Sequence, residues 1–117
     1  MAKDYKELKI WQKGIEIVNK TYDLTDGFPK SELYTLVSQM RRSALSIPSN
    51  IAEGFVRRHP KEHKQFLYVA LGSAAELETQ IIVATHRKYI NEEDSKKLTG
   101  EINIENKMIM SLIQKIN

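Results

Sequence analysis

Apolar residues recur at intervals of three and four through most of the sequence, which is the spacing of one face of an α-helix. This pattern predicts four helices, over residues 6–26, 31–55, 60–87 and 92–115. Their apolar stripes consist of Leu8, Trp11, Ile15, Val18 and Tyr22 in the first, Leu33, Leu36, Met40, Ala44, Ile47 and Ile51 in the second, Leu67, Ala70, Ala74, Leu77, Ile81 and Ala84 in the third, and Leu98, Ile102, Ile109, Leu112 and Ile116 in the fourth. Because the connections are short, neighbouring helices should be antiparallel. The sequence therefore predicts a single all-α domain, residues 1–117, built as an up-down-up-down four-helix bundle.

Residues at the predicted helix ends support these boundaries. Gly27 is placed to cap the C-terminus of the first helix, and Ser31 to cap the N-terminus of the second. Pro60 fits the first position of the third helix, where its missing N–H is not needed. Asn91 is expected to cap the fourth helix, whose first residues are acidic and complement the positive helix terminus.

Pro48 lies inside the second predicted helix. A proline removes one backbone donor and crowds the carbonyl four residues earlier, so the helix should kink there. The alternative is a break with a restart at Asn50, because Asn50 and Glu53 have the spacing of a capping box. The apolar stripe stays in phase across the proline, which favours one helix kinked at Pro48.

The third predicted helix is apolar on more than one face. Phe66, Val69 and Val83 lie beside its main apolar stripe, and the small residues 72–75 would let another helix approach closely. So much apolar surface in a short chain predicts contact with a partner chain. Gly14 in the first helix likewise indicates a close contact with a neighbouring helix, since glycine is otherwise unfavourable there by about 1 kcal/mol.

Composition narrows the class of protein. The chain has 117 residues, of which 41% are hydrophobic and 28% charged, as in folded soluble proteins. The absence of cysteine excludes disulfides and thiolate metal sites. The N-terminal residues do not resemble a signal peptide, and no window approaches the roughly 20 apolar residues that cross a bilayer. We therefore expect a cytoplasmic protein with no membrane contact.

Candidate catalytic and metal-binding residues do not form a convincing site. Glu76 and Glu78 are two residues apart, so they point to different sides of a helix and cannot converge on one substrate. His59 and His63 have a spacing that can bind a metal, but no acidic third ligand follows at the next turn. There is no nucleophile elbow and no phosphate-binding loop. The sequence predicts a protein that is not an enzyme and has no cofactor or metal.

Arginine is concentrated in one part of the chain. Residues 31–58 contain four arginines and two glutamates, whereas the rest of the chain uses mainly lysine, and the net charge is +3. The planar guanidinium group suits phosphate and carboxylate partners. The candidate contacts to nucleic acid are Arg41, Arg42, Arg57, Arg58, Lys61 and Lys64. The competing interpretation is ordinary solvated surface charge, and repetition of the cluster in an oligomer would favour nucleic-acid binding.

Several of the same polar residues are also candidates for a structural network. Its expected members are Arg41, Arg42, Asn50, Glu53, Glu76 and Glu78. Partly buried charge-assisted hydrogen bonds between the second and third helices would fix their register rather than perform chemistry.

Three stretches resemble a known family: LKIWQKGIEIV, SQMRRSALSIPSNIAEGF and FLYVALGSAAELETQI. The chain is similar to the four-helix bundle proteins encoded in intervening sequences of bacterial 23S ribosomal RNA genes, which are related to the accessory protein of diversity-generating retroelements. Gly14 and Val56 stand where that family would have alanine and glycine. The resemblance implies a ring-like homopentamer, and the related accessory protein implies a basic nucleic-acid-binding surface.

The expected function is therefore a homo-oligomeric bundle, a pentamer according to the resemblance, that binds structured RNA or another nucleic acid. The alternative is a protein–protein assembly scaffold with no role in nucleic-acid binding.

Overall fold

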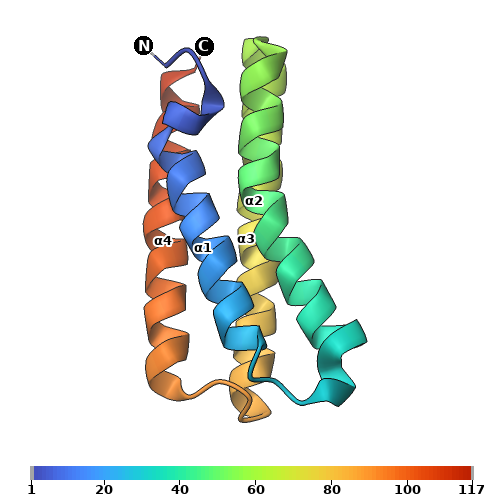
Figure 1. Cartoon of the computed structure of the whole chain (residues 1–117). Coiled ribbons are helices and arrows are strands. Elements are labelled where there is room, and N and C mark those ends of the chain that lie inside the picture. Colours follow the sequence, from blue (N-terminus) through green and yellow to red (C-terminus); the bar gives the residue numbers. More distant parts are fainter. Residues whose placement is uncertain (1, 117) are drawn as a thin grey trace.

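The structure, a computed structural model that describes residues 2–116, is a bundle of four antiparallel α-helices (Figure 1). The helices are α1 (Lys9–Thr25), α2 (Ser38–Arg57), α3 (Pro60–His86) and α4 (Glu92–Lys115). Each helix packs against its neighbours in sequence, and α1 also packs against α4, which closes the bundle. The predicted all-α, up-down-up-down topology is confirmed. The 27-residue α3, about 40 Å long at 1.5 Å per residue, spans most of the 44 Å length of the molecule.

The predicted apolar stripes supply most of the core. Leu33 in the second stripe is an exception, since it is 44% exposed, and Leu112 and Ile116 in the fourth are only half-buried. All six stripe residues of α3 are fully buried, as are Ile47 and Ile51 of α2. In α1, however, the buried face is centred on Ile17 and Thr21, and Trp11 is only half-buried. The prediction missed this face because threonine counts as polar. The Thr21 hydroxyl donates to the Ile17 carbonyl oxygen at 2.8 Å, so burial leaves it with a partner.

The chain enters α2 by an irregular route. A short 3₁₀ turn, η2 (Lys30–Glu32), leads into a π-helical turn, η3 (Leu33–Val37), before regular α-helix begins at Ser38. Ser31 lies inside η2 and caps no helix, so its predicted role as N-cap is wrong. α2 then runs unbroken past Pro48, and the alternative restart at Asn50 does not occur. The kink at Pro48 stays a prediction.

The residues that end one helix and begin the next differ between the three connections. Asn91 caps α4 as predicted, since its side-chain oxygen accepts a hydrogen bond of 2.7 Å from the Asp94 amide. Gly27 does not adopt the left-handed conformation of a glycine cap. Among the described residues, positive φ occurs instead at Arg58 and Lys88, which follow α2 and α3. Arg58 is the residue directly after α2, whereas Lys88 is the second residue after α3, at the opposite end of the molecule.

α2 and α3 approach each other closely through small and polar residues. A Cβ added to Gly54 would lie 2.9 Å from the Cβ of Phe66, so only glycine fits there. Further along, the hydroxyls of Ser46 and Ser73 form a hydrogen bond of 2.8 Å between the two helices. The Asn50 side-chain amide donates to the Ser46 hydroxyl at 2.8 Å and extends this bridge.

The helix α3 carries more apolar surface than one bundle buries. It is long and apolar enough to cross a membrane by length and composition, so the expectation that no window approaches this was too strong. A core helix of a soluble protein meets the same test, but here only 33% of the apolar window is buried. A large part of its apolar surface therefore faces outward from the bundle.

Candidate nucleic-acid interface

The turn between α2 and α3 carries most of the predicted basic contacts. Arg57 ends α2, and Arg58 follows in the left-handed conformation with φ 56° and ψ 23°. His59 is extended and precedes Pro60, which begins α3 as predicted. Figure 1 shows this turn at the same end of the bundle as both ends of the described chain. The left-handed turn is therefore what places basic side chains from two helices at one end of the molecule.

Arg57 is largely neutralised by its own neighbours. Its guanidinium group lies 3.4 Å from a carboxylate oxygen of Glu53 and 3.5 Å from one of Glu62. It also lies over the ring of Phe66, at 5.2 Å from the centroid. These contacts tie the end of α2 to the first turns of α3. Arg57 thus contributes more to the structure of the turn than to its net field.

Arg58, Lys61 and Lys64 supply the positive charge that remains. None of the three forms an ion pair with another described residue. Arg58 and Lys61 are exposed, and Lys64 is half-buried. A residue in the left-handed conformation is usually glycine or asparagine, because a larger side chain is disfavoured there by roughly 1 kcal/mol. Arg58 therefore keeps an unpaired cation at a position where the backbone favours a smaller residue.

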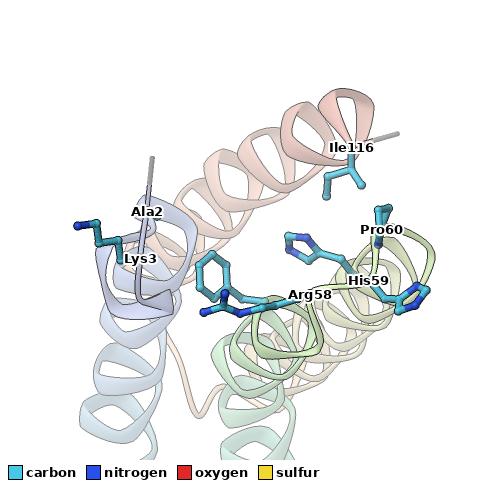
Figure 2. A pocket seen from close by; sticks show the side chains of 8 residues that line it. Ala2, Lys3, Arg58, His59, Pro60 and Ile116 are labelled. Carbon is cyan, nitrogen blue, oxygen red and sulfur yellow. The ribbon is translucent and has the colours of Figure 1, made fainter.

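An open pocket lies beside the turn (Figure 2). Its volume is about 670 Å³, and it is lined by Ala2, Lys3, Phe55, Arg58, His59, Pro60, His63 and Ile116. No carboxylate is among these residues. In Figure 2, Arg58, His59 and Pro60 lie on the α2–α3 side of the opening, and Ala2 and Lys3 lie across from them. The pocket lining thus combines apolar side chains with the basic side chains of Lys3 and Arg58.

The two histidines of the turn differ in environment. His59 is exposed, whereas the Nε2 atom of His63 is buried without a hydrogen-bond partner among the described residues. Burial lowers the pKa of His63 below its usual value of 6.5, so the imidazole is neutral at pH 7 and adds no positive charge. Residues 2–116 contain no cluster of three or more acidic or histidine side chains that could hold a metal ion.

Arg41 and Arg42 lie at the other end of α2, about 24 Å away along the helix. The Arg41 guanidinium donates to the Asp26 carboxylate at 2.8 Å and to the Thr25 hydroxyl at 3.0 Å. It also stacks over the ring of Tyr22 at 4.4 Å. Arg41 therefore fastens α2 to the C-terminal end of α1, while Arg42 is exposed and forms no ion pair with the described residues. The structure does not bring these two arginines together with Arg57 and Arg58.

The predicted network between α2 and α3 has different members. Neither Glu76 nor Glu78 forms an ion pair or side-chain hydrogen bond with a described residue, because Glu76 points to solvent and Arg41 is held on the α1 side. Glu53 pairs along its own helix with Arg57. Only Asn50 takes part in the bridge between the helices, where Ser46 and Ser73 supply the hydroxyl groups. The expected salt-bridge network was therefore wrong within one chain.

The sequence prediction missed a group of charged residues between α1 and α4, some of them partly or fully buried. Lys13 donates to Glu101 at 2.7 Å, and Lys20 pairs with the other oxygen of the same carboxylate. One turn further along α4, Glu105 is fully buried, and neither of its carboxylate oxygens has a hydrogen-bond partner in the described chain. Burial raises the pKa of Glu105 to about 8, opposed by Lys13, so the group is mostly protonated at neutral pH. The only sequence signal was a glutamate on the apolar side of α4.

The fold and the sequence both resemble those of known proteins. The structure is similar to the crystal structure of a protein of unknown function from the S23 ribosomal protein family of Bacteroides thetaiotaomicron. The TM-score is 0.83 at 23% sequence identity, over 90% of this chain and 95% of that one. No curated protein matches the sequence. The family model of 23S rRNA-intervening sequence proteins matches residues 6–111, and the chain belongs to this family.

Proposed function

We propose that this protein is a homo-oligomeric, non-enzymatic helical bundle that binds structured RNA through the basic side chains at the α2–α3 turn. The observation that carries the proposal is the charge of Arg58, Lys61 and Lys64, which form no ion pair with residues 2–116, beside a pocket with no acidic lining residue in that part of the chain. Each phosphate that a cation neutralises releases counterions, so clustered unpaired cations favour nucleic acid. Family membership adds an association with 23S rRNA intervening sequences.

Self-association strengthens the electrostatic argument. Three cations on one chain provide modest affinity, whereas several copies of the turn at one end of an oligomer would present a continuous basic rim. The apolar surface that α3 leaves outside the bundle supports association between chains. The alternative function is an assembly scaffold without nucleic acid, which the same apolar surface supports equally.

A matched pair of variants tests the RNA interface. Arg58→Asn with Lys61→Gln removes two positive charges from the α2–α3 turn, and asparagine suits the left-handed position. Lys88→Asn with Lys96→Gln makes the same changes at the α3–α4 turn, because Lys88 is also left-handed, with φ 66°. Binding of a labelled RNA hairpin should weaken at least tenfold in the first variant and remain unchanged in the control.

The salt dependence of binding is the second readout. The affinity of the unmodified protein should fall steeply with salt, and the slope of log K against log salt should decrease by roughly one for each phosphate that the variant no longer binds. Equal weakening in both double variants would place the RNA-binding surface elsewhere. Absence of binding at low salt would refute the RNA proposal and leave the scaffold function.

A further inference from the structure

The outer face of α3 has the spacing of a second helix-packing seam. Its buried seam is already filled by α2 and α4. On the opposite side, exposed residues recur at intervals of four and three over six positions, Tyr68, Gly72, Ala75, Thr79, Ile82 and His86. Tyr68 and Ile82 are 54% and 50% exposed, and a Cβ on Gly72 would meet nothing within 4 Å. This set of residues, the α3 seam, has the form of a coiled-coil interface without its partner.

The outer face of α2 repeats the same pattern. Its exposed and half-buried positions with the same intervals are Ser38, Arg42, Leu45, Ser49, Ala52 and Val56. Leu45 and Val56 are 43% and 56% exposed, although both are large apolar residues. Tyr34 in η3, which is 89% exposed, lies just before this set of residues, the α2 seam. The irregular entry to α2 therefore ends next to a second unfilled helix face.

The two seams have the same length, and their residue sizes and charges complement each other. Each covers 18 residue steps, or about 27 Å of helix. Laid antiparallel with their ends aligned, they place Ala52 opposite Gly72 and Ser49 opposite Ala75, so that small residues face small residues and the helices can approach closely. The only charged member of the α2 seam is Arg42, which has no ion pair in the described chain.

The α3 seam has the complementary charge at its borders. Glu76 and Glu78 flank it on either side, and neither has an ion-pair partner among residues 2–116. In this register Arg42 lies level with Ile82, one helical turn from Glu78, so the pairing brings an unpaired arginine of one copy near an unpaired glutamate of the next. Lipid would offer no anionic partner within the apolar layer for Arg42 and would leave Glu76 and Glu78 unpaired. The charge pattern thus favours a protein partner.

We infer that the α2 seam of one copy packs against the α3 seam of the next copy. This inference rests on the self-association proposed above and names its interface. Because the two seams are different surfaces, the contact is heterologous, and repeated contacts generate a closed ring or an open filament. In the antiparallel arrangement, which α2 and α3 already adopt within one chain, successive copies place their α2–α3 turns at the same end. The interface thus creates the shared basic rim that RNA binding requires.

Two single variants and their mixture test this interface. Leu45→Asp blocks the α2 seam, and Ile82→Asp blocks the α3 seam, both at exposed positions. Each variant alone should be monomeric by light scattering, whereas the unmodified protein should be oligomeric. An equimolar mixture should form a dimer of one copy of each, because one intact α2 seam and one intact α3 seam remain. The dimer should not grow further.

Other outcomes overturn the inference in distinguishable ways. A monomeric unmodified protein refutes self-association itself. An oligomer that persists in either single variant, or a mixture that stays monomeric while circular dichroism shows folded helices, refutes this pairing of seams but not self-association. If either aspartate variant unfolds, Ser49→Glu and Thr79→Glu repeat the test at exposed polar positions of the same seams. Flotation of the unmodified protein with lipid vesicles would assign the α3 seam to a membrane instead.

Discussion

Gly14 of α1 faces the carboxyl group of Glu105 of α4 inside the bundle. A Cβ added to Gly14 would lie 3.3 Å from Oε2 of Glu105 and 3.2 Å from the Cβ of Pro48. The glycine therefore makes room for a carboxyl group from one helix and a proline ring from another, as its position in the sequence predicted. Three helices meet at this point, and it contains the only fully buried carboxyl group among the described residues.

The buried carboxyl group should make folding stability depend on pH. The pKa of Glu105 is about 8 in the folded protein and near 4.5 when unfolded, so between these values only the folded state binds the proton. The free energy of unfolding should then fall as pH rises, by up to about 1.4 kcal/mol per pH unit from this group. Glu105→Gln, which stays neutral, should remove that decline in urea unfolding measured from pH 5 to pH 8.

The comparison between variants isolates Glu105 from other titrating groups. His63 acts in the opposite sense below about pH 6.5, because burial lowers its pKa and protonation favours the unfolded state. The difference between the unmodified protein and Glu105→Gln cancels that contribution. Asp23→Asn, at an exposed position outside both seams and with no ion pair among the described residues, is the control and should leave the pH dependence unchanged. Parallel curves for all three proteins would contradict a protonated Glu105.

The neighbouring Glu101 should respond to pH with the opposite sign. Partial burial opposes ionisation, but hydrogen bonds from Lys13 and Lys20 prevail and hold the pKa of Glu101 below its usual 4.5. The stability that it contributes is present above about pH 4.5 and is lost as pH falls through the folded pKa. Glu101→Gln should therefore lower stability at pH 7 by about 1 kcal/mol and flatten the acid side of the unfolding profile. If the decrease in stability below about pH 4.5 were the same in Glu101→Gln, other carboxylates would be the cause of acid unfolding.

Helix periodicity predicted the number of helices, their topology and the buried stripe of α3 from residues such as Leu67 and Leu77, because burial of an apolar stripe is the dominant local constraint. It did not predict the π-helical turn at Leu33–Val37, since no single residue type requires one. Glu105 was also missed, because a polar residue on an apolar face becomes informative only when its neighbours in space are known.

The candidate site was predicted less completely than the fold. The six basic residues were identified by composition, but composition cannot say which cations are already paired. The structure divides them: Arg41 and Arg57 have carboxylate partners, whereas Arg42, Arg58 and the two lysines have none among the described residues. Whether a cation is paired depends on contacts in space, such as that between Arg41 and Asp26. The sequence predicted these two residues on separate helices but did not indicate that they are in contact.

Adjacent arginines in α2 should therefore differ in their effect on stability. Arg41→Gln removes the hydrogen bonds to Asp26 and Thr25 and the stacking on Tyr22, and should lower the free energy of unfolding by about 1 kcal/mol. Arg42→Gln removes an exposed side chain and should leave the stability of the single chain within about 0.5 kcal/mol of the unmodified protein. Both are measured by urea unfolding in the Ile82→Asp background, which separates chain stability from assembly. Equal effects would contradict a structural role specific to Arg41.

Two glycines in helices should respond in opposite directions to the same substitution. A Cβ on Gly54 would lie 2.9 Å from the Cβ of Phe66 and 3.2 Å from the His63 carbonyl oxygen, so Gly54→Ala must push α2 away from α3. Thermal unfolding should show a loss of about 1–3 kcal/mol. Gly100 in α4 has nothing within 4 Å of an added Cβ, and Gly100→Ala should stabilise the chain by about 0.5–1 kcal/mol through helix propensity alone. If Gly54→Ala instead stabilised the protein, α2 and α3 would not be as close as in the structure, because the added methyl group would not clash with Phe66.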